Sequence, residues 1–181
     1  GYNFQASYNG EKYGALVYGT VGRPDFKALQ IEEGGGASGS AAFDDRYKVG
    51  LSYFYGSTDL RKRHVFGPWA ILGFTEHAYL LTEHDLVRST LRTGTQASTL
   101  GYVNSQRVAY EPLQGLHAYF RQEFGQLDLK SNGTHQQVYG LGLLYYPRAH
   151  WEFQLEYQKR KAGAGSQSFF DYAYAQLHFY L

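Results

Sequence analysis

The chain has no cysteine among its 181 residues, which excludes disulfides, thiol nucleophiles and cysteine-ligated metals. Its 17 Lys and Arg nearly balance 16 Asp and Glu, so the formal net charge of +1 creates no field that would favour nucleic acid. The sequence has no run of about 18 apolar residues, and therefore predicts no transmembrane helix. Strands escape this last test, because only every second residue of a membrane-spanning strand has to be apolar.

Proline is scarce as well, with 4 residues, whereas glycine reaches 22 and the aromatic residues include 18 Tyr and 12 Phe. Aromatic residues favour strands and glycine favours tight turns, so this composition predicts an all-β protein. No shift in composition divides the chain, and we expect one domain over residues 1–181. The chain lacks methionine and starts at Gly1, close to a strand-like stretch, so we expect a processed chain or one part of a longer protein.

Alternation of apolar and polar residues is the main structural signal, and residues 151–160 (WEFQLEYQKR) show it most clearly. The same rhythm predicts about ten strands. Pro68 weakens one of them, Asn104 and Gln106 break the alternation of another and suggest a bulge, and the Gly/Ser-rich residues 23–42 predict a long loop. The expected strands cover residues 2–8, 11–22, 43–56, 64–73, 77–88, 97–110, 115–127, 136–146, 150–160 and 169–181.

The connections between the later strands alternate in length. Residues 111–114 and 147–149 are tight, whereas 127–135 and 161–168 are longer and rich in Gly, Ser and Asn. This asymmetry is typical of antiparallel transmembrane β-barrels of bacterial outer membranes, which have short periplasmic turns and longer outer loops. The last strand would then end on the periplasmic side.

Alternation alone does not say which face of the strands contacts water, since a soluble lipocalin-like binder shows the same period with its apolar side inward. The number of aromatic rings near the strand ends favours the membrane, because such rings form girdles at bilayer interfaces and would overfill a small barrel interior. We therefore expect these residues to face lipid: Tyr47, Tyr53, Phe120, Tyr139, Trp151, Phe153, Tyr157 and Phe179.

The opposite parity carries charges of both signs, which can pair or be hydrated in a lumen. The residues expected to face the lumen are Arg46, Lys48, Glu83, Asp85, Arg107, Arg121, Glu123, Glu152, Glu156 and Arg160. Basic residues also gather near the expected outer loops, where they would either contact lipopolysaccharide phosphates or serve as solvated loop charges. The residues expected at the outer leaflet are Arg61, Lys62, Arg63, Lys159 and Lys161.

The C-terminal segment FFDYAYAQLHFYL is apolar at every second position from Leu181 back through Phe179 and Leu177 to Ala175 and Ala173. It resembles the last strand of bacterial outer-membrane barrels, although Leu181 stands where those strands usually end in Phe or Trp. The resemblance covers the last four strands. It implies an integral protein of a Gram-negative outer membrane, surrounded by its lipids and lipopolysaccharide and inserted by the barrel-assembly machinery.

Enzymatic sites have little support in the sequence. The seven histidines show no ligand pair on one strand face, so we expect no metal and no cofactor. In Glu83-His84-Asp85 the histidine points away from both carboxylates in a strand. An outer-membrane hydrolase remains an alternative, built by geometry from residues such as Ser52, Ser105 and His117.

The sequence therefore predicts a porin-like barrel that gives a polar passage to ions or small solutes, or a shell for a partner component. If the chain closes alone, the charged lumen residues would plug it. If the chain is the C-terminal part of a larger barrel, which we slightly favour, the same residues would line a channel. The alternatives are an anchoring barrel with a plugged lumen in an envelope complex, the hydrolase, and a soluble binder.

Overall fold

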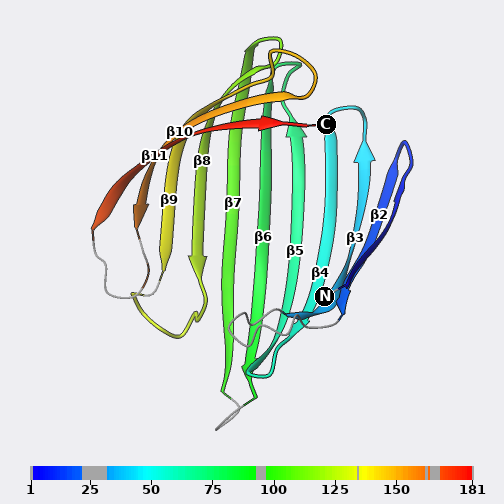
Figure 1. Cartoon of the computed structure of the whole chain (residues 1–181), viewed down its shortest axis with the longest axis vertical. Helices are drawn as coiled ribbons and strands as arrows, with labels where there is room; N and C mark the ends of the chain where they lie inside the picture. The colour runs from blue at the N-terminus through cyan, green and yellow to red at the C-terminus, as the bar shows by residue number, and fades with distance from the viewer. Residues whose placement is uncertain are drawn as a thin grey trace.

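The computed structural model describes residues 2–21, 32–92, 97–133, 135–161, 163 and 168–180. Within these residues the chain forms eleven strands in one antiparallel sheet and no helix. The strands follow one another across the sheet in chain order (Figure 1). They are β1 (Tyr2–Asn9), β2 (Tyr13–Val21), β3 (Glu33–Phe43), β4 (Tyr47–Ser57), β5 (Arg61–Gly73), β6 (Ala78–Leu91), β7 (Ser98–Leu113), β8 (Leu116–Gln126), β9 (Gln136–Tyr145), β10 (Trp151–Lys161) and β11 (Phe169–Phe179).

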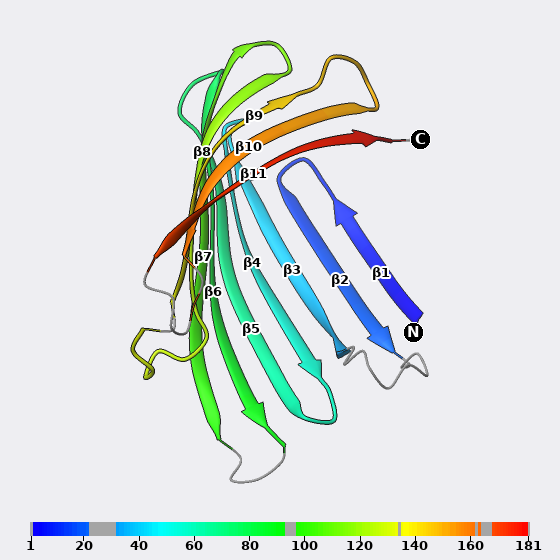
Figure 2. The same cartoon turned by 60° about the vertical axis from the view of Figure 1, so that its left-hand side comes forward.

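The sheet is strongly curved and open (Figure 2). In the described residues β1 and β11 are its two edges and do not pair with each other. The predicted all-β antiparallel architecture is confirmed, with one strand more than expected. The described strands do not close into a barrel.

The two faces of the sheet differ in chemistry, as the alternation predicts. The outer face carries Trp151, Phe153 and every second residue in register with them, and the inner face carries Glu156, Gln158 and theirs. Curling crowds the inner face and spreads the outer one: Glu156 and Gln158 are 1% and 0% exposed, whereas Trp151 and Phe153 are 40% and 42% exposed. The buried apolar residues Val87, Ala109 and Tyr119 also belong to the inner face.

The expected loop over residues 23–42 is wrong in its second half. Residues 33–43 form β3, which pairs with β2 and β4 along its length. Its sequence hides the strand period, because the residues on both faces are glycine, alanine or serine and give no apolar contrast. Residues 23–31 of the expected loop, residue 22 of the expected strand before it and Leu181 of the last expected strand lie outside the described residues.

Once β3 is counted as a strand, the connections between strands divide into two groups, one at each end of the sheet. Those after β1, β3, β5, β7 and β9 share one end of the sheet, here the turn end, and those after β2, β4, β6, β8 and β10 share the other, here the loop end. The turn after β3 covers Asp44–Arg46, with Asp44 at a φ of 60°. Arg46, expected inside a strand, therefore lies in this turn. At the turn after β7, Gly115 has a φ of 77°, a conformation that glycine adopts without strain.

The two expected irregularities have different outcomes. Pro68 lies within β5. Because proline has no amide hydrogen for the ladder, pairing with β6 is interrupted between Phe66 and Trp69, and it then resumes in the same register. The bulge expected at Asn104 and Gln106 is wrong, since β7 pairs there with both neighbours without a shift. The register shift of β7 lies between Tyr110 and Leu113 instead.

No helix of the described residues is long and apolar enough to cross a membrane.

The glycines of β3 give a matched test of the sheet packing. A Cβ added at Gly34 would collide with the Tyr55 carbonyl oxygen of β4, whereas one at Gly39 would meet nothing within 4 Å. We expect Gly34→Ala to lower the free energy of unfolding by about 1–3 kcal/mol through overpacking. Gly39→Ala should change it by less than about 1 kcal/mol, with the sign of a stabilisation. Urea unfolding followed by circular dichroism measures both, and equal losses would contradict the β3–β4 pairing.

Candidate functional site on the inner face

A carboxylate surrounded by donors is the best-defined site of the inner face. Glu156 of β10 accepts hydrogen bonds from the Tyr119 hydroxyl (2.6 Å) and the Tyr174 hydroxyl (2.8 Å) at Oε2. At Oε1 it accepts one from Gln158 Nε2 (2.6 Å) and faces an Arg121 guanidinium nitrogen at 2.9 Å. Three strands, β8, β10 and β11, thus converge on one buried charge.

Further side chains tie the cluster together. Gln154 Nε2 lies 2.7 Å from the Tyr119 hydroxyl, 2.9 Å from the Tyr174 hydroxyl and 3.3 Å from Glu156 Oε2. Arg160 Nε donates to the side-chain oxygen Oε1 of Gln158, and its guanidinium lies over the Tyr172 ring at 4.2 Å. The set is called the Glu156 network below and consists of Tyr119, Arg121, Gln154, Glu156, Gln158, Arg160 and Tyr174.

Two glycines of β9 provide the space for this network. Gly140 lies opposite Arg121 on β8 and Gln158 on β10, and a Cβ there would come within 2.5 Å of Glu156 Oε1. A Cβ at Gly142 would collide with the Tyr119 ring. On the outer face the alternate residues of β9 are bulky, as with Leu141 and Leu143. The glycine-leucine repeat therefore lets long polar side chains of β8 and β10 meet across β9.

The network holds the Glu156 carboxylate in place and occupies its lone pairs, so this carboxylate is not available as a free base. A buried carboxylate costs little only when its lone pairs are filled, and here tyrosines, glutamines and an arginine fill them. The carboxylate is thus a fixed negative charge on the inner face.

A second acidic group lies farther along the inner face. Glu83 and Asp85 share that side of β6, as expected, while His84 lies on the outer face. Asp85 sits directly over Gly67, where a Cβ would collide with its carboxylate. Ser52 donates to the Gly67 carbonyl oxygen at 3.1 Å, so its hydroxyl has a structural partner.

The residues expected to face a lumen share the inner face, except Arg46 in its turn. The structure brings Arg121 within 3.4 Å of Glu123 and 2.9 Å of Glu156, and places Arg107 over the Tyr119 ring at 4.5 Å. Lys48 lies over Trp69 at 5.9 Å. The others belong to the same face by register: Glu83, Asp85, Glu152 and Arg160.

The tyrosines and glutamines of the network were not among the inner-face residues predicted from the sequence. Tyr119 and Tyr174 alternate in phase with the charged residues of their strands. A single tyrosine, however, is equally typical of an aromatic girdle. Gln154 and Gln158 share the polar parity of β10 without carrying charge. The usable signal was the pair Gly140 and Gly142, which leaves room on that parity only.

The eight aromatic residues expected to face lipid all lie exposed on the outer face. The expected outer-leaflet residues lie at the loop end of the sheet. Arg61 and Arg63 are on the inner face and pair with Glu32, at 3.3 Å and 2.5 Å. Lys159 pairs with Asp171 at 3.1 Å. Lys161 lies 3.2 Å from His135, and Lys62 is exposed on the outer face.

The residues named for a hydrolase come from three different strands. His117 of β8 has its Nδ1 3.3 Å from the Tyr79 hydroxyl, and Ser52 of β4 bonds to backbone. Ser105 lies on β7 opposite Glu83. In the part of the chain that the structure describes, no group of three or more His, Asp and Glu side chains could hold a metal ion.

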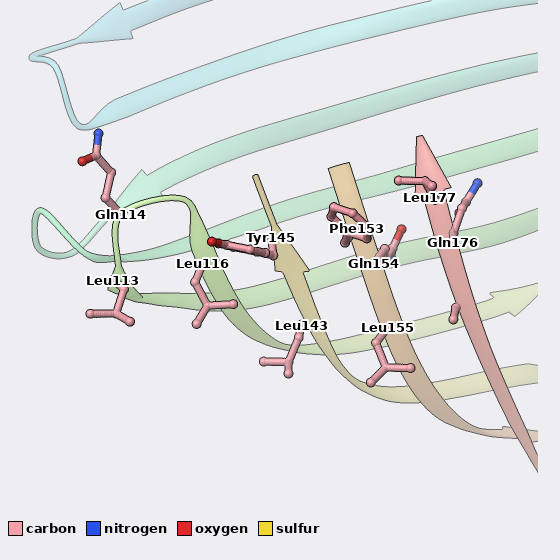
Figure 3. A pocket seen from close by; sticks show the side chains of 11 residues that line it. Leu113, Gln114, Leu116, Leu143, Tyr145, Phe153, Gln154, Leu155, Gln176 and Leu177 are labelled. Carbon is pink, nitrogen blue, oxygen red and sulfur yellow. The ribbon is translucent and has the colours of Figure 1, made fainter. Parts of the chain in front are cut away.

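The outer face also has a shallow apolar hollow near the turn end. Leu113, Leu116, Leu143 and Leu155 point to the same side of the sheet there (Figure 3). Tyr145, Phe153 and Leu177 also line it. Most of its lining residues belong to the outer face, whereas Gln154 and Gln176 stand on the inner face by register.

No protein-family model matches the chain, and no curated protein sequence is significantly similar to it. The chemistry of the two faces of the sheet is therefore the basis for the proposed function.

The burial of Glu156 makes a sharp prediction. Glu156→Gln places an amide donor among donors and leaves Arg121 without its buried partner, so we expect the free energy of unfolding to fall by roughly 3–5 kcal/mol. Glu123→Gln is the matched control: Glu123 faces the same arginine at 3.4 Å, but its side chain is 37% exposed. That change should cost less than about 1 kcal/mol. Urea unfolding of both variants compares the two, and similar losses would contradict a central role of Glu156.

Proposed function

We propose that this chain forms the wall of a transmembrane β-barrel in a bacterial outer membrane, whose polar inner face gives a passage to ions or small solutes. The observation that carries the proposal is the chemistry of the outer face. Every strand contributes at least one exposed large apolar side chain to it: Phe4, Val17, Phe43, Leu51, Phe66, Leu86, Val108, Phe120, Leu141, Leu155 and Leu177.

Such a face has no place in water. Soluble monomers rarely expose contiguous apolar patches above roughly 300–600 Å². A soluble lipocalin-like binder would carry the polar face outside and the apolar face inside, which is the opposite of the burial in this sheet. Hydrocarbon tails are the solvent that suits side chains of this kind on all eleven strands.

The inner face supports a water-filled or partly filled interior. It carries Lys48, Glu83, Arg107 and Glu152, with the Glu156 network as a densely packed part between β8 and β11. Charges of both signs on one concave face suit a lumen, where they pair with one another or meet water.

Closure depends on the strand number. In an antiparallel sheet of eleven strands β1 and β11 run in the same direction. Closing the described sheet on itself would therefore require one parallel pair, whereas an additional strand between them would make every pair antiparallel, as in bacterial barrels with even strand numbers. The wider barrel of the second route would leave more room beside the Glu156 network.

The two ends of the sheet fit one orientation. The turn end, with its tight connections, would face the periplasm, and the loop end would face outward. Basic side chains such as Arg61, Lys62 and Lys159 lie at the loop end, where they would meet lipopolysaccharide phosphates.

The two tryptophans make the membrane proposal testable, since Trp151 lies on the outer face and Trp69 on the inner face. In vesicles of brominated lipid we expect the fluorescence of Trp69→Phe, which retains Trp151, to be strongly quenched. The fluorescence of Trp151→Phe, which retains Trp69, should be quenched much less. The comparison is internal to one fold, and equal quenching, or a protein that stays monomeric without detergent, would refute the proposal.

The passage itself is tested by conductance in a planar bilayer. If ions pass along the inner face, Glu83→Gln with Asp85→Asn should shift the reversal potential in a salt gradient toward anion selectivity, because two negative charges leave the lumen. Asp171→Asn, on the outer face beside Lys159, should leave the reversal potential unchanged. Zero conductance with Trp151 still quenched by lipid would favour an anchoring barrel with a plugged lumen.

A further inference from the structure

A chain of polar side chains without carboxylate, ammonium or guanidinium groups crosses the outer face, where the neighbouring residues are apolar. Thr82 Oγ1 lies 3.0 Å from His84 Nε2, and His84 Nδ1 lies 2.6 Å from the Tyr102 hydroxyl. Asn104 Nδ2 donates to the same hydroxyl at 3.3 Å, and Gln122 Nε2 donates to Asn104 Oδ1 at 3.4 Å. These five residues of β6, β7 and β8 are called the polar strip.

The polar strip lies at mid-height and not at an end of the sheet. His84 stands midway along β6, opposite Asn104, and Gln106 lies on the same face between Thr82 and Gln122. Exposed apolar residues border it above, below and beside: Leu86, Leu100, Val108 and Phe120. An interruption of the apolar outer face is thus concentrated in one place.

The surface is also lowered next to the polar strip. A hollow on the outer face of β3, β4 and β5 reaches Thr82 and His84, and its lining combines the small residues Gly39, Ala41 and Ala70 with larger apolar ones such as Val49 and Leu51. Polar groups and a depression of the surface therefore coincide at mid-height. Both features favour contact with another protein surface over contact with lipid tails.

The energetic cost of the polar strip depends on the proposed membrane placement. Hydrocarbon offers no hydrogen bonds, so each unsatisfied polar group there is strongly unfavourable. The contacts within the strip fill part of the capacity: a side-chain amide such as that of Asn104 has two donor hydrogens and an acceptor with two lone pairs, and two of these are used inside the strip. A protein surface can supply the remaining partners.

A second copy of this chain suits the polar strip. Two copies inserted in the same orientation have their strips at the same depth, so a two-fold axis along the membrane normal brings strip against strip. Asn, Gln, Tyr, Thr and neutral His each donate and accept, which makes the strip self-complementary and free of like-charge repulsion. We propose that the polar strip and the hollow beside it form the contact between two copies of this chain in the membrane.

The test uses introduced thiols, since the chain has no cysteine of its own. In vesicles, Asn104→Cys in the strip is compared with Leu155→Cys, which lies on the outer face of β10 away from it. We expect a short thiol cross-linker to give dimers with Asn104→Cys, and with Gln122→Cys as a second position, and to leave Leu155→Cys monomeric. A fluorophore on each cysteine, with brominated lipid as quencher, reports lipid contact in the same samples.

The outcomes separate the two proposals. A label at Leu155→Cys that lipid quenches, together with dimers through Asn104→Cys, supports the contact. If both labels are equally quenched and neither Asn104→Cys nor Gln122→Cys cross-links, or if Leu155→Cys cross-links as readily, the contact is refuted while the membrane placement stands. If lipid quenches neither label, the membrane placement fails, and the dimer inference fails with it.

Discussion

The two-residue period of the strands, held in register across the whole sheet, is the constraint on which every other feature depends. Side chains separate into two faces only while neighbouring strands keep their alignment, and a slip of one residue would exchange the faces. The pairing is continuous from β1 to β11, apart from the interruption at Pro68 and the shift after Tyr110. Apolar and polar chemistry thus stay apart over eleven strands without any segment that is apolar throughout.

Local packing reinforces this alignment at the Glu156 network. Tyr119, Glu156 and Tyr174 come from β8, β10 and β11, and their bonds form only if all three strands keep the observed register. Gly140 and Gly142 remove the side chains of β9 that would stand between them. The same atoms therefore stabilise the register and fill part of the inner face.

The sequence predicted the all-β antiparallel architecture, most strands and the separation of charged and aromatic residues onto two faces, because apolar contrast between neighbours reveals a strand. It failed at residues 33–43, where glycine, alanine and serine give no contrast, and the pairing with β4 makes the strand visible only in three dimensions. It interpreted Asn104 as a local irregularity, whereas its polar partners come from neighbouring strands. Contacts between distant segments, such as Tyr119 with Glu156, leave no pattern in a single strand.

The missing ladder pairs beside Pro68 have a mechanical consequence. Backbone pairing between β5 and β6 is interrupted at Gly67 and Pro68, so this seam holds fewer bridging amides than its length allows. A force that pulls the sheet apart sideways would open it there first, into one half of five strands and another of six. Each half would keep its own ladders, and the acidic pair and the polar strip would stay together on the half that contains β6.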